Sequence, residues 1–203
     1  MLYSPPRFIE TDTALIRELT AAYPFATLMS VVAGQPLVSH VPLVADERGW
    51  LLGHVATANP HSAALSEGAE ALAIFQGPHC YVSPSWYAEA SVPTWNYTAV
   101  HVRARLHVLQ GDAAQALLDR LTQAFDDPTQ PGHMTAAQRA RLLPAIHCFA
   151  LEPLETSAKF KLSQNKSRED QQSILANLGQ FDDDNSQGVA SLMLRNLAAG
   201  FGN

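Results

Sequence analysis

Basic residues are scarce in this chain of 203 residues, which has 13 lysines and arginines against 19 aspartates and glutamates. The resulting net charge of −6 opposes long-range attraction to nucleic acid or to an anionic membrane. A basic N-terminal region followed by an apolar run is missing, so we expect no signal peptide. Apolar runs of the roughly 18 residues needed to cross a membrane are also missing. We therefore expect a cytoplasmic protein that contacts no membrane and does not bind DNA directly.

Cysteine is rarer still, and Cys80 and Cys148 have a spacing that suggests neither a disulfide framework nor a zinc knuckle. The pairs His79-Cys80 and His147-Cys148 would not chelate a metal by themselves, because neighbours in an extended chain point to opposite sides. The sequence also lacks H-E-x-x-H, G-x-S-x-G, a Walker loop and G-x-G-x-x-G. We therefore predict no metal site, and we can name no catalytic residue.

Apolar residues make up 47% of the chain, enough for a sizeable core. Short apolar runs between turn residues predict strands at 25–33, 36–45, 50–55, 71–76, 100–109 and 146–151. Helical patterns are predicted at 12–23, 112–125, 136–142, 168–178 and 189–199. Short antiparallel strands with peripheral helices favour a small barrel over a parallel sheet.

Residues 77–95 are predicted to form an irregular loop, because Pro78, Pro84 and Pro93 interrupt regular structure. Aromatic side chains of this region could wall a flat ligand: Trp86, Tyr87, Trp95 and Tyr97. They could instead close one end of the barrel or form a dimer interface. The residues alone leave these alternatives open.

The segment KFKLSQN at 159–165 carries a second candidate site. If it is extended, one face offers two ammonium groups, a hydroxyl and an amide, from Lys159, Lys161, Ser163 and Asn165. Phe160 and Leu162 would anchor the opposite face. Two fixed cations with neutral donors suit a phosphate group. A solvated sheet edge protected by lysines is the alternative.

A third candidate is GHVATANPH at 53–61, where Asn59 can cap the start of a short helix. The free N–H groups at a helix start favour an anion. The alternative is an ordinary Asn-Pro helix start that binds nothing.

Six stretches resemble, in the same order, the PaiB-type FMN-binding negative transcriptional regulators, a family of the FMN-binding split-barrel superfamily. They are YSPPRFIE (3–10), YPFATL (23–28), GHVATANPH (53–61), IFQGPHCYVSPSWY (74–87), VPTWNYTAVH (92–101) and KFKLSQNKSRED (159–170). Together they extend from Tyr3 to about Leu178. IFQGPHCYVSPSWY and KFKLSQN are long enough to make the resemblance specific.

The resemblance implies a mainly β fold with peripheral helices, an antiparallel Greek-key split β-barrel that binds FMN. We expect the FMN-binding barrel at 1–165, a C-terminal helical extension at 166–203, and a homodimer with FMN in clefts between the copies. The implied function is flavin binding or sensing linked to gene regulation, although the chain has no DNA-binding motif. Two alternatives remain: a flavin-dependent oxidoreductase of the flavin reductase or pyridoxamine-phosphate oxidase type, and a dimeric split barrel that has lost its flavin.

Residue by residue, the cofactor-binding candidates that fall on the family's motif positions are His54, Asn59, Gln76, Ser83, Trp86, Trp95, Asn96, Lys159, Lys161, Ser163, Gln164 and Asn165. Which of them touch the flavin is inferred from their chemistry. Thr57 departs from the family pattern, which commonly has a basic residue there. We therefore expect Lys159 and Lys161 to carry the phosphate.

Overall fold

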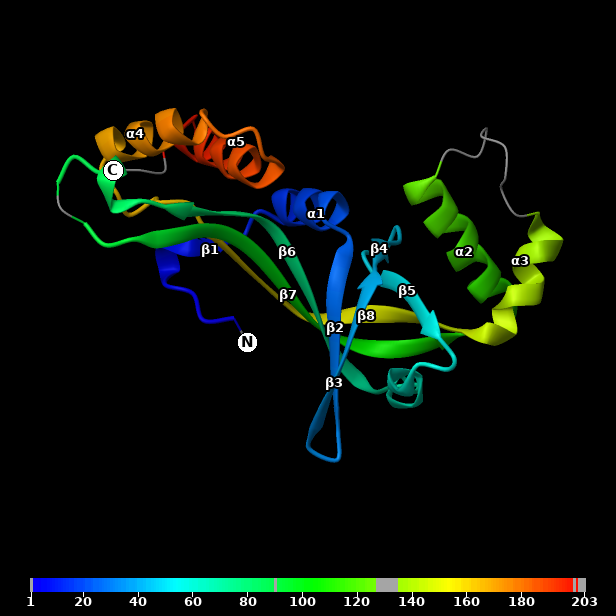
Figure 1. Cartoon of the computed structure of the whole chain (residues 1–203). Coiled ribbons are helices and arrows are strands. Elements are labelled where there is room, and N and C mark those ends of the chain that lie inside the picture. The colour runs from blue at the N-terminus through cyan, green and yellow to red at the C-terminus, as the bar shows by residue number, and fades with distance from the viewer. Residues whose placement is uncertain (1, 90, 127–134, 199, 201–203) are drawn as a thin grey trace. The chain divides into compact units, whose positions relative to one another are not determined.

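The computed structural model describes residues 2–89, 91–126, 135–198 and 200. The chain divides into two compact units. The first comprises Met1–Ala22, Gln76–Val100 and Ser157–Asn203, and the second comprises Tyr23–Phe75 and His101–Thr156. Three long strands, β6 (Glu70–Val82), β7 (Thr94–Leu109) and β8 (Ile146–Lys161), contribute residues to both units (Figure 1).

The second unit begins with a hairpin of β2 (Phe25–Val32) and β3 (Gln35–Pro42). Its turn residues, Ala33 and Gly34, have φ of 49° and 78°. Positive φ at both turn positions matches the right-handed twist of the paired strands. β2 also pairs antiparallel with β6 over Thr27–Met29.

The rest of the second unit packs helices against a short sheet. β4 (Val44–Ala45) pairs with β5 (Leu51–Ala56), and β5 pairs antiparallel with β8. A 3-10 helix, η2 (Pro60–Ala64), follows β5, while α2 (Gly111–Phe125) and α3 (Ala136–Leu142) lie between β7 and β8. One face of α2 is buried in a core cluster of Leu52, Ala114, Leu117, Leu121, Cys148 and Ala150.

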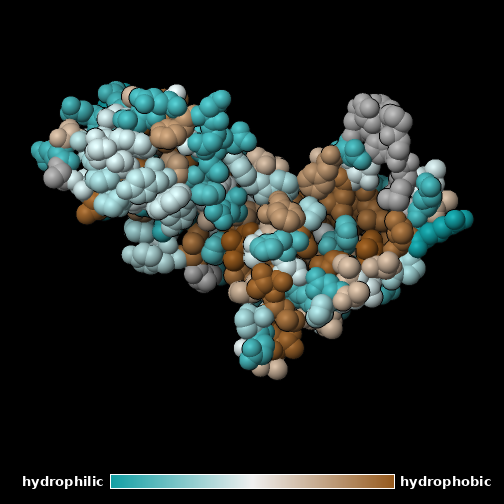
Figure 2. Space-filling view, in the orientation of Figure 1, coloured by the Kyte–Doolittle hydropathy of each residue, from teal (hydrophilic) through white to brown (hydrophobic). Residues whose placement is uncertain are grey.

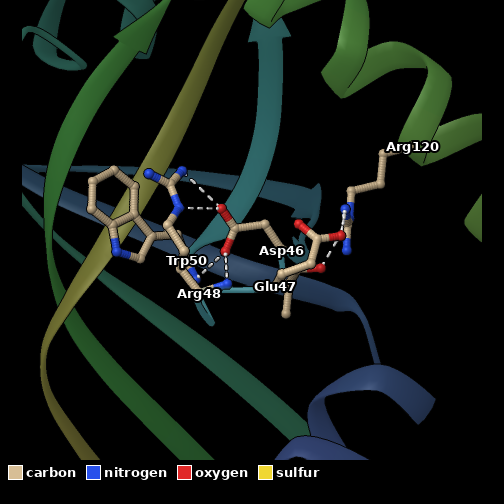
Figure 3. A network of polar contacts seen from close by, with 6 residues as sticks. Asp46, Glu47, Arg48, Trp50 and Arg120 are labelled. Atoms are coloured by element: carbon tan, nitrogen blue, oxygen red, sulfur yellow. Dashed lines mark hydrogen bonds and ion pairs between the residues drawn. The ribbon is translucent and has the colours of Figure 1, made fainter.

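A polar network fixes the turn between β4 and β5 (Figure 3). Asp46 accepts hydrogen bonds from the backbone N–H groups of Arg48 and Trp50, and its carboxylate lies 2.8 Å from the Arg48 guanidinium. Arg120 of α2 donates to the Ala45 carbonyl and to the Glu47 carboxylate at 3.0 and 2.7 Å. The network therefore attaches α2 to the turn.

The first unit contains β1 (Ile9–Glu10), which pairs with β8, and the helices α1 (Thr13–Ala22), α4 (Arg168–Leu178) and α5 (Asp184–Ala198). Side-chain caps begin these helices. Asp12 accepts from the N–H of Ala14, Ser167 from that of Asp170, and Asp183 from that of Ser186. Arg195 of α5 forms a salt bridge with Glu18 of α1 at 2.8 Å.

The prediction of an irregular loop across 77–95 is wrong at both ends, because β6 continues to Val82 and β7 begins at Thr94. Burial alternates along β6 but shifts by one residue at Gly77-Pro78, where two successive residues are buried. A shift of this kind marks a bulge, where a proline costs no ladder hydrogen bond. Only 83–93 connects the two strands, starting with the 3-10 turn η3 (Pro84–Trp86).

Two further boundaries differ from the sequence-based prediction. The strand predicted at 146–151 extends to Lys161, and the helix predicted at 189–199 begins at Asp184. Asp183 caps this earlier start by accepting from the N–H of Ser186. Residue 199 lies outside the described residues.

The predicted fold class is confirmed: the protein is mainly β, with peripheral helices and an antiparallel sheet of the split-barrel type. The strand order is β3-β2-β6-β7-β8-β5-β4, with β1 paired to β8. Among the described residues, no helix is both long and apolar enough to span a lipid bilayer. The division at residue 165 stays a prediction. Both C-terminal helices, α4 and α5, fall in the first unit with the end of β8.

Candidate functional site

One face of the sheet in the first unit is defined by alternation along β6, β7 and β8, which are neighbours in that order. The even-numbered residues are buried: Cys80, Val82, Asn96, Thr98, Ala158 and Phe160. The odd-numbered residues point the opposite way, and we call their surface the lysine–aromatic face: His79, Tyr81, Trp95, Tyr97, Lys159 and Lys161. The Trp95 ring lies 6.2 Å from the His79 ring and 6.1 Å from the Tyr81 ring. Trp95 and Tyr81 are 53% and 46% exposed, so planar surface is available here.

Lys159 lies on this face yet is buried, because the N-terminal segment covers it. β1 pairs Ile9 with Lys159, and the Lys159 Nζ donates to the Tyr3 carbonyl at 3.1 Å. The rings of Tyr3 and Tyr97 lie 5.6 and 5.2 Å from the Nζ atom. Two aromatic rings therefore stabilise the buried ammonium where a carboxylate would usually do so.

Lys161 is half-buried at the end of β8. Its Nζ donates to the Trp95 carbonyl at 2.8 Å and to the Thr94 hydroxyl. Burial lowers the pKa of Lys161, and the ammonium groups of Lys159 and Lys166 lower it further. Lys159 lies two positions before Lys161 on β8, and Lys166 follows the turn after it.

Lys166 is a site candidate that sequence reasoning missed. Its Nζ donates to the Ser91 hydroxyl at 2.9 Å and lies 4.2 Å from the centre of the Tyr87 ring. The buried Tyr87 hydroxyl has no hydrogen-bond partner among the described residues, and burial followed by the Asp170 charge raises the pKa of Tyr87. The sequence could have identified Lys166 by its position directly after KFKLSQN.

These three residues, Lys159, Lys161 and Lys166, are all the lysines of the chain. In the described ranges, none of them forms a salt bridge. Concentrated positive charge without carboxylate partners favours an anion, and the adjoining rings favour a planar group. These features suit a planar anionic ligand, and the phosphate role of Lys159 and Lys161 stays a prediction.

The prediction that Ser163 and Asn165 continue the lysine row is wrong, because the strand ends at Lys161. Ser163 has φ of 63°, which turns the chain. Its buried hydroxyl donates to the Asn96 side chain at 3.0 Å, and Asn96 in turn contacts the Met193 sulfur at 3.6 Å. Ser163 and Asn96 therefore connect β7, the turn and α5 behind the face, while the Asn165 side chain is exposed.

Gln164 is used within the same turn. Its side chain accepts from the N–H of Leu162 at 2.7 Å and donates to the Phe160 carbonyl at 2.6 Å. These two bonds replace ladder bonds that the chain loses where it leaves the sheet. In this arrangement Gln164 holds the turn that places Lys166.

Three further candidates lie on or beside β6. Gln76 is exposed, and its amide nitrogen lies 3.4 Å from the His79 Nδ1. Ser83 caps the 3-10 turn by accepting from the N–H of Ser85 at 3.3 Å. Trp86 tilts against Phe181, with 6.1 Å between ring centres. Gln76 is free to reach a ligand, whereas Ser83 and Trp86 shape the loop after β6.

The remaining two candidates, His54 and Asn59, belong to the second unit. Asn59 accepts from the N–H of His61 at 2.9 Å and donates to the Ser39 hydroxyl, which lies 2.9 Å from the His61 Nδ1. The helix that Asn59 starts is a 3-10 helix of five residues, too short for a strong dipole. Burial lowers the pKa of His54 and of His61, which favours the neutral imidazole in both.

Thiol and metal chemistry gain no support from the part of the chain that the structure describes. Burial raises the pKa of Cys80 and of Cys148 to about 11, which leaves both as unreactive thiols. No group of three histidine, cysteine, aspartate or glutamate side chains among the described residues is arranged to hold a metal ion.

Comparisons with known proteins identify the family. A protein-family model described as "Putative FMN-binding domain" matches residues 2–153. The sporulation protein PAI 2 of Bacillus subtilis, whose full name is "Protease synthase and sporulation protein PAI 2", is 29% identical over 199 residues. That alignment covers 95% of this chain and 96% of the Bacillus protein.

Solved structures share the fold. The FAD and heme binding protein from Mycobacterium smegmatis is 25% identical, with a TM-score of 0.62 over 75% of this chain and 73% of that chain. The flavocytochrome Anf3 from Azotobacter vinelandii is 18% identical, with a TM-score of 0.59 over 75% of this chain and 69% of that one. The family match spans most of the chain and agrees with the sequence motifs. The chain therefore belongs to the family of FMN-binding domains that the PaiB-type motifs predicted.

Proposed function

We propose that the protein binds FMN through the lysine–aromatic face and serves as a flavin-binding regulator. Lys159 and Lys161, with Lys166 beside them, would hold the phosphate, and Trp95 and Tyr97 would contact the ring system. Bound flavin supplies hydride or single-electron transfer. His54, Asn59 and Gln76 stay predicted contacts, whereas Ser83, Trp86, Asn96, Ser163 and Gln164 are proposed to position the elements around the ligand.

One observation carries this proposal: the three lysines of the chain lie at the end of β8 and just after it, and none of them forms a salt bridge among the described residues. Bringing three cations together is unfavourable unless an anion offsets their repulsion. Aromatic rings on the neighbouring strands add the planar surface that a flavin requires. The residues present therefore fit a phosphate attached to a flat ring.

The regulatory part of the proposal rests on similarity to the PaiB-type family and to the Bacillus sporulation protein PAI 2. We infer that regulation acts through the ligand or a partner protein in the cytoplasm, since a net charge of −6 disfavours direct DNA binding. We also propose a homodimer, as the family resemblance implies.

The test is a titration of purified protein with FMN, followed by flavin fluorescence and by the melting temperature. Wild-type protein should bind FMN and melt at a higher temperature with it. Changing Lys159→Ala and Lys161→Ala together should weaken binding by about tenfold or more, because charge-assisted hydrogen bonds contribute roughly 1.5–3 kcal/mol each.

The exposed Arg168→Ala is the matched control, since it removes a nearby cation that the site does not use. Lys159→Met with Lys161→Met keeps most of the apolar stems and guards against a loss of folding. Unchanged FMN affinity in a folded double variant would remove the phosphate role. Absence of binding by the wild type would refute the flavin proposal itself.

A further inference from the structure

The three lysines differ in what surrounds their amines. The ammonium groups of Lys159 and Lys166 lie over aromatic rings, at 5.2 Å from Tyr97 and 4.2 Å from Tyr87. Such rings stabilise the charged form of an amine. Among the described residues, no ring lies beneath the Lys161 amine, and two cations flank it. Lys161 therefore lacks the aromatic stabilisation of the charged form that the other two amines have.

Geometry also prepares the Lys161 nitrogen for reaction. In its protonated form, two N–H bonds point at the Trp95 carbonyl and the Thr94 hydroxyl. When the third proton leaves, the lone pair takes its place and points away from both acceptors. An amine that is partly desolvated and beside other cations is a known arrangement for a nucleophilic lysine. Arginine, which the chain uses at its other basic positions, has no such reactivity.

We propose that Lys161 forms an imine with aromatic aldehydes that carry a phosphate, and that this modification competes with flavin for the site. The flanking ammonium groups hold the phosphate, and the aromatic side chains of the face contact the ring. The proposal deepens the proposed function, since it assigns a second ligand class and a means of regulation to the same site.

The reaction balances without an oxidant or a reductant. The amine lone pair attacks the aldehyde carbon, and the nitrogen gives up a proton while the carbonyl oxygen gains one. Loss of that oxygen as water leaves a carbon–nitrogen double bond. Aldehyde and amine become imine and water, and the lowered pKa of Lys161 supplies free amine for the first step.

The probe is pyridoxal 5′-phosphate, added to wild-type protein and fixed with borohydride before peptide mass spectrometry. The chain is well suited to this test, because Lys159, Lys161 and Lys166 are its only lysines. We expect Lys161 to carry most of the label. Pyridoxal without phosphate should label it about tenfold more slowly, because the bound phosphate positions the aldehyde. Lys161→Arg should lose the label, while the exposed Arg168→Ala, outside the proposed site, should leave labelling at Lys161 unchanged.

Adding FMN separates this proposal from the flavin proposal. If FMN binds and slows labelling of Lys161, both are supported. Selective labelling in a protein that binds no FMN supports the aldehyde site alone and overturns the flavin proposal. Equal labelling of all three lysines and the N-terminal amine overturns the aldehyde site, whatever FMN does. If bound FMN does not change the labelling of Lys161, the aldehyde and FMN do not compete for one site, and that part of the proposal is wrong.

Discussion

Gly77 shows how closely the first unit is packed behind the lysine–aromatic face. A Cβ added there would lie 2.3 Å from the Thr98 hydroxyl and 2.7 Å from a Leu19 methyl group. Both contacts are shorter than van der Waals separation, so α1 and β7 would have to move. We predict that Gly77→Ala destabilises the protein by about 1–3 kcal/mol, as overpacking usually does. Urea unfolding measures the loss.

The control is Gly179→Ala, where the nearest atoms to an added Cβ lie 3.5 and 3.7 Å away. This substitution should leave the unfolding midpoint nearly unchanged. Equal midpoints for Gly77→Ala and the wild type would mean that α1 does not pack on β6 as described.

Ser163 marks the limit of what residue-level reasoning could predict about the site. Strand alternation correctly places Lys159 and Lys161 on one face, because β8 continues through them. The same alternation fails at Ser163, whose positive φ no local pattern announces. Serine carries no conformational signal comparable to glycine. The partner that favours this turn, Asn96, is 67 positions away in the sequence.

Among the elements, β7 carries a histidine whose charge should make stability depend on pH. His107 lies 2.9 Å from the Glu67 carboxylate and 3.0 Å from the Glu152 carboxylate, and it stacks on Trp50. Hydrogen bonding with Glu152, and then with Glu67, raises the pKa of His107. The folded state therefore binds this proton more tightly than the unfolded state does. The stabilisation is complete below the unfolded value of about 6.5 and is lost as the pH rises through the higher folded pKa.

We predict that His107→Gln lowers the melting temperature more at about pH 6 than at about pH 9, because only the charged imidazole attracts both carboxylates. His101→Gln provides the contrast. Burial lowers the pKa of His101, so its imidazole is neutral when folded and opposes folding at low pH. That substitution should become relatively favourable as the pH falls. Parallel melting curves at both pH values for His107→Gln would contradict the assigned ion pairs.

Element boundaries show why the sequence predicted the class of fold correctly but the lengths of its strands too short. The strand predicted at 100–109 is part of β7, and the helix predicted from residue 12 is α1, which Asp12 caps. The extension of β6 past Pro78 depended on a bulge, which arises from pairing between strands and leaves no local signal. The unpredicted ends of β6 and β7 carry the aromatic side chains of the lysine–aromatic face.

For the whole molecule, the proposed homodimer gives a reason for apolar side chains that one chain leaves exposed. On the β2–β3 hairpin, Phe25, Val31 and Val38 are 68%, 62% and 53% exposed. Figure 2 shows hydrophobic surface along this hairpin. Register places Val38 beside Met29 and Val31 beside Pro36, so these residues form a continuous apolar strip. Such an exposed apolar strip favours contact with a second copy.

We predict that analytical ultracentrifugation gives about twice the 22.0 kDa mass of one chain. Val31→Glu together with Val38→Glu should shift the protein toward the single-chain mass, because the two charges would be desolvated in an interface. Leu194→Glu is the control, since Leu194 is 57% exposed on α5 and lies outside the strip. A dimer that survives the valine changes would exclude the hairpin as the interface, and a wild-type monomer would exclude the dimer. A folded monomeric variant that still binds FMN would further locate the flavin site within a single chain, on the lysine–aromatic face.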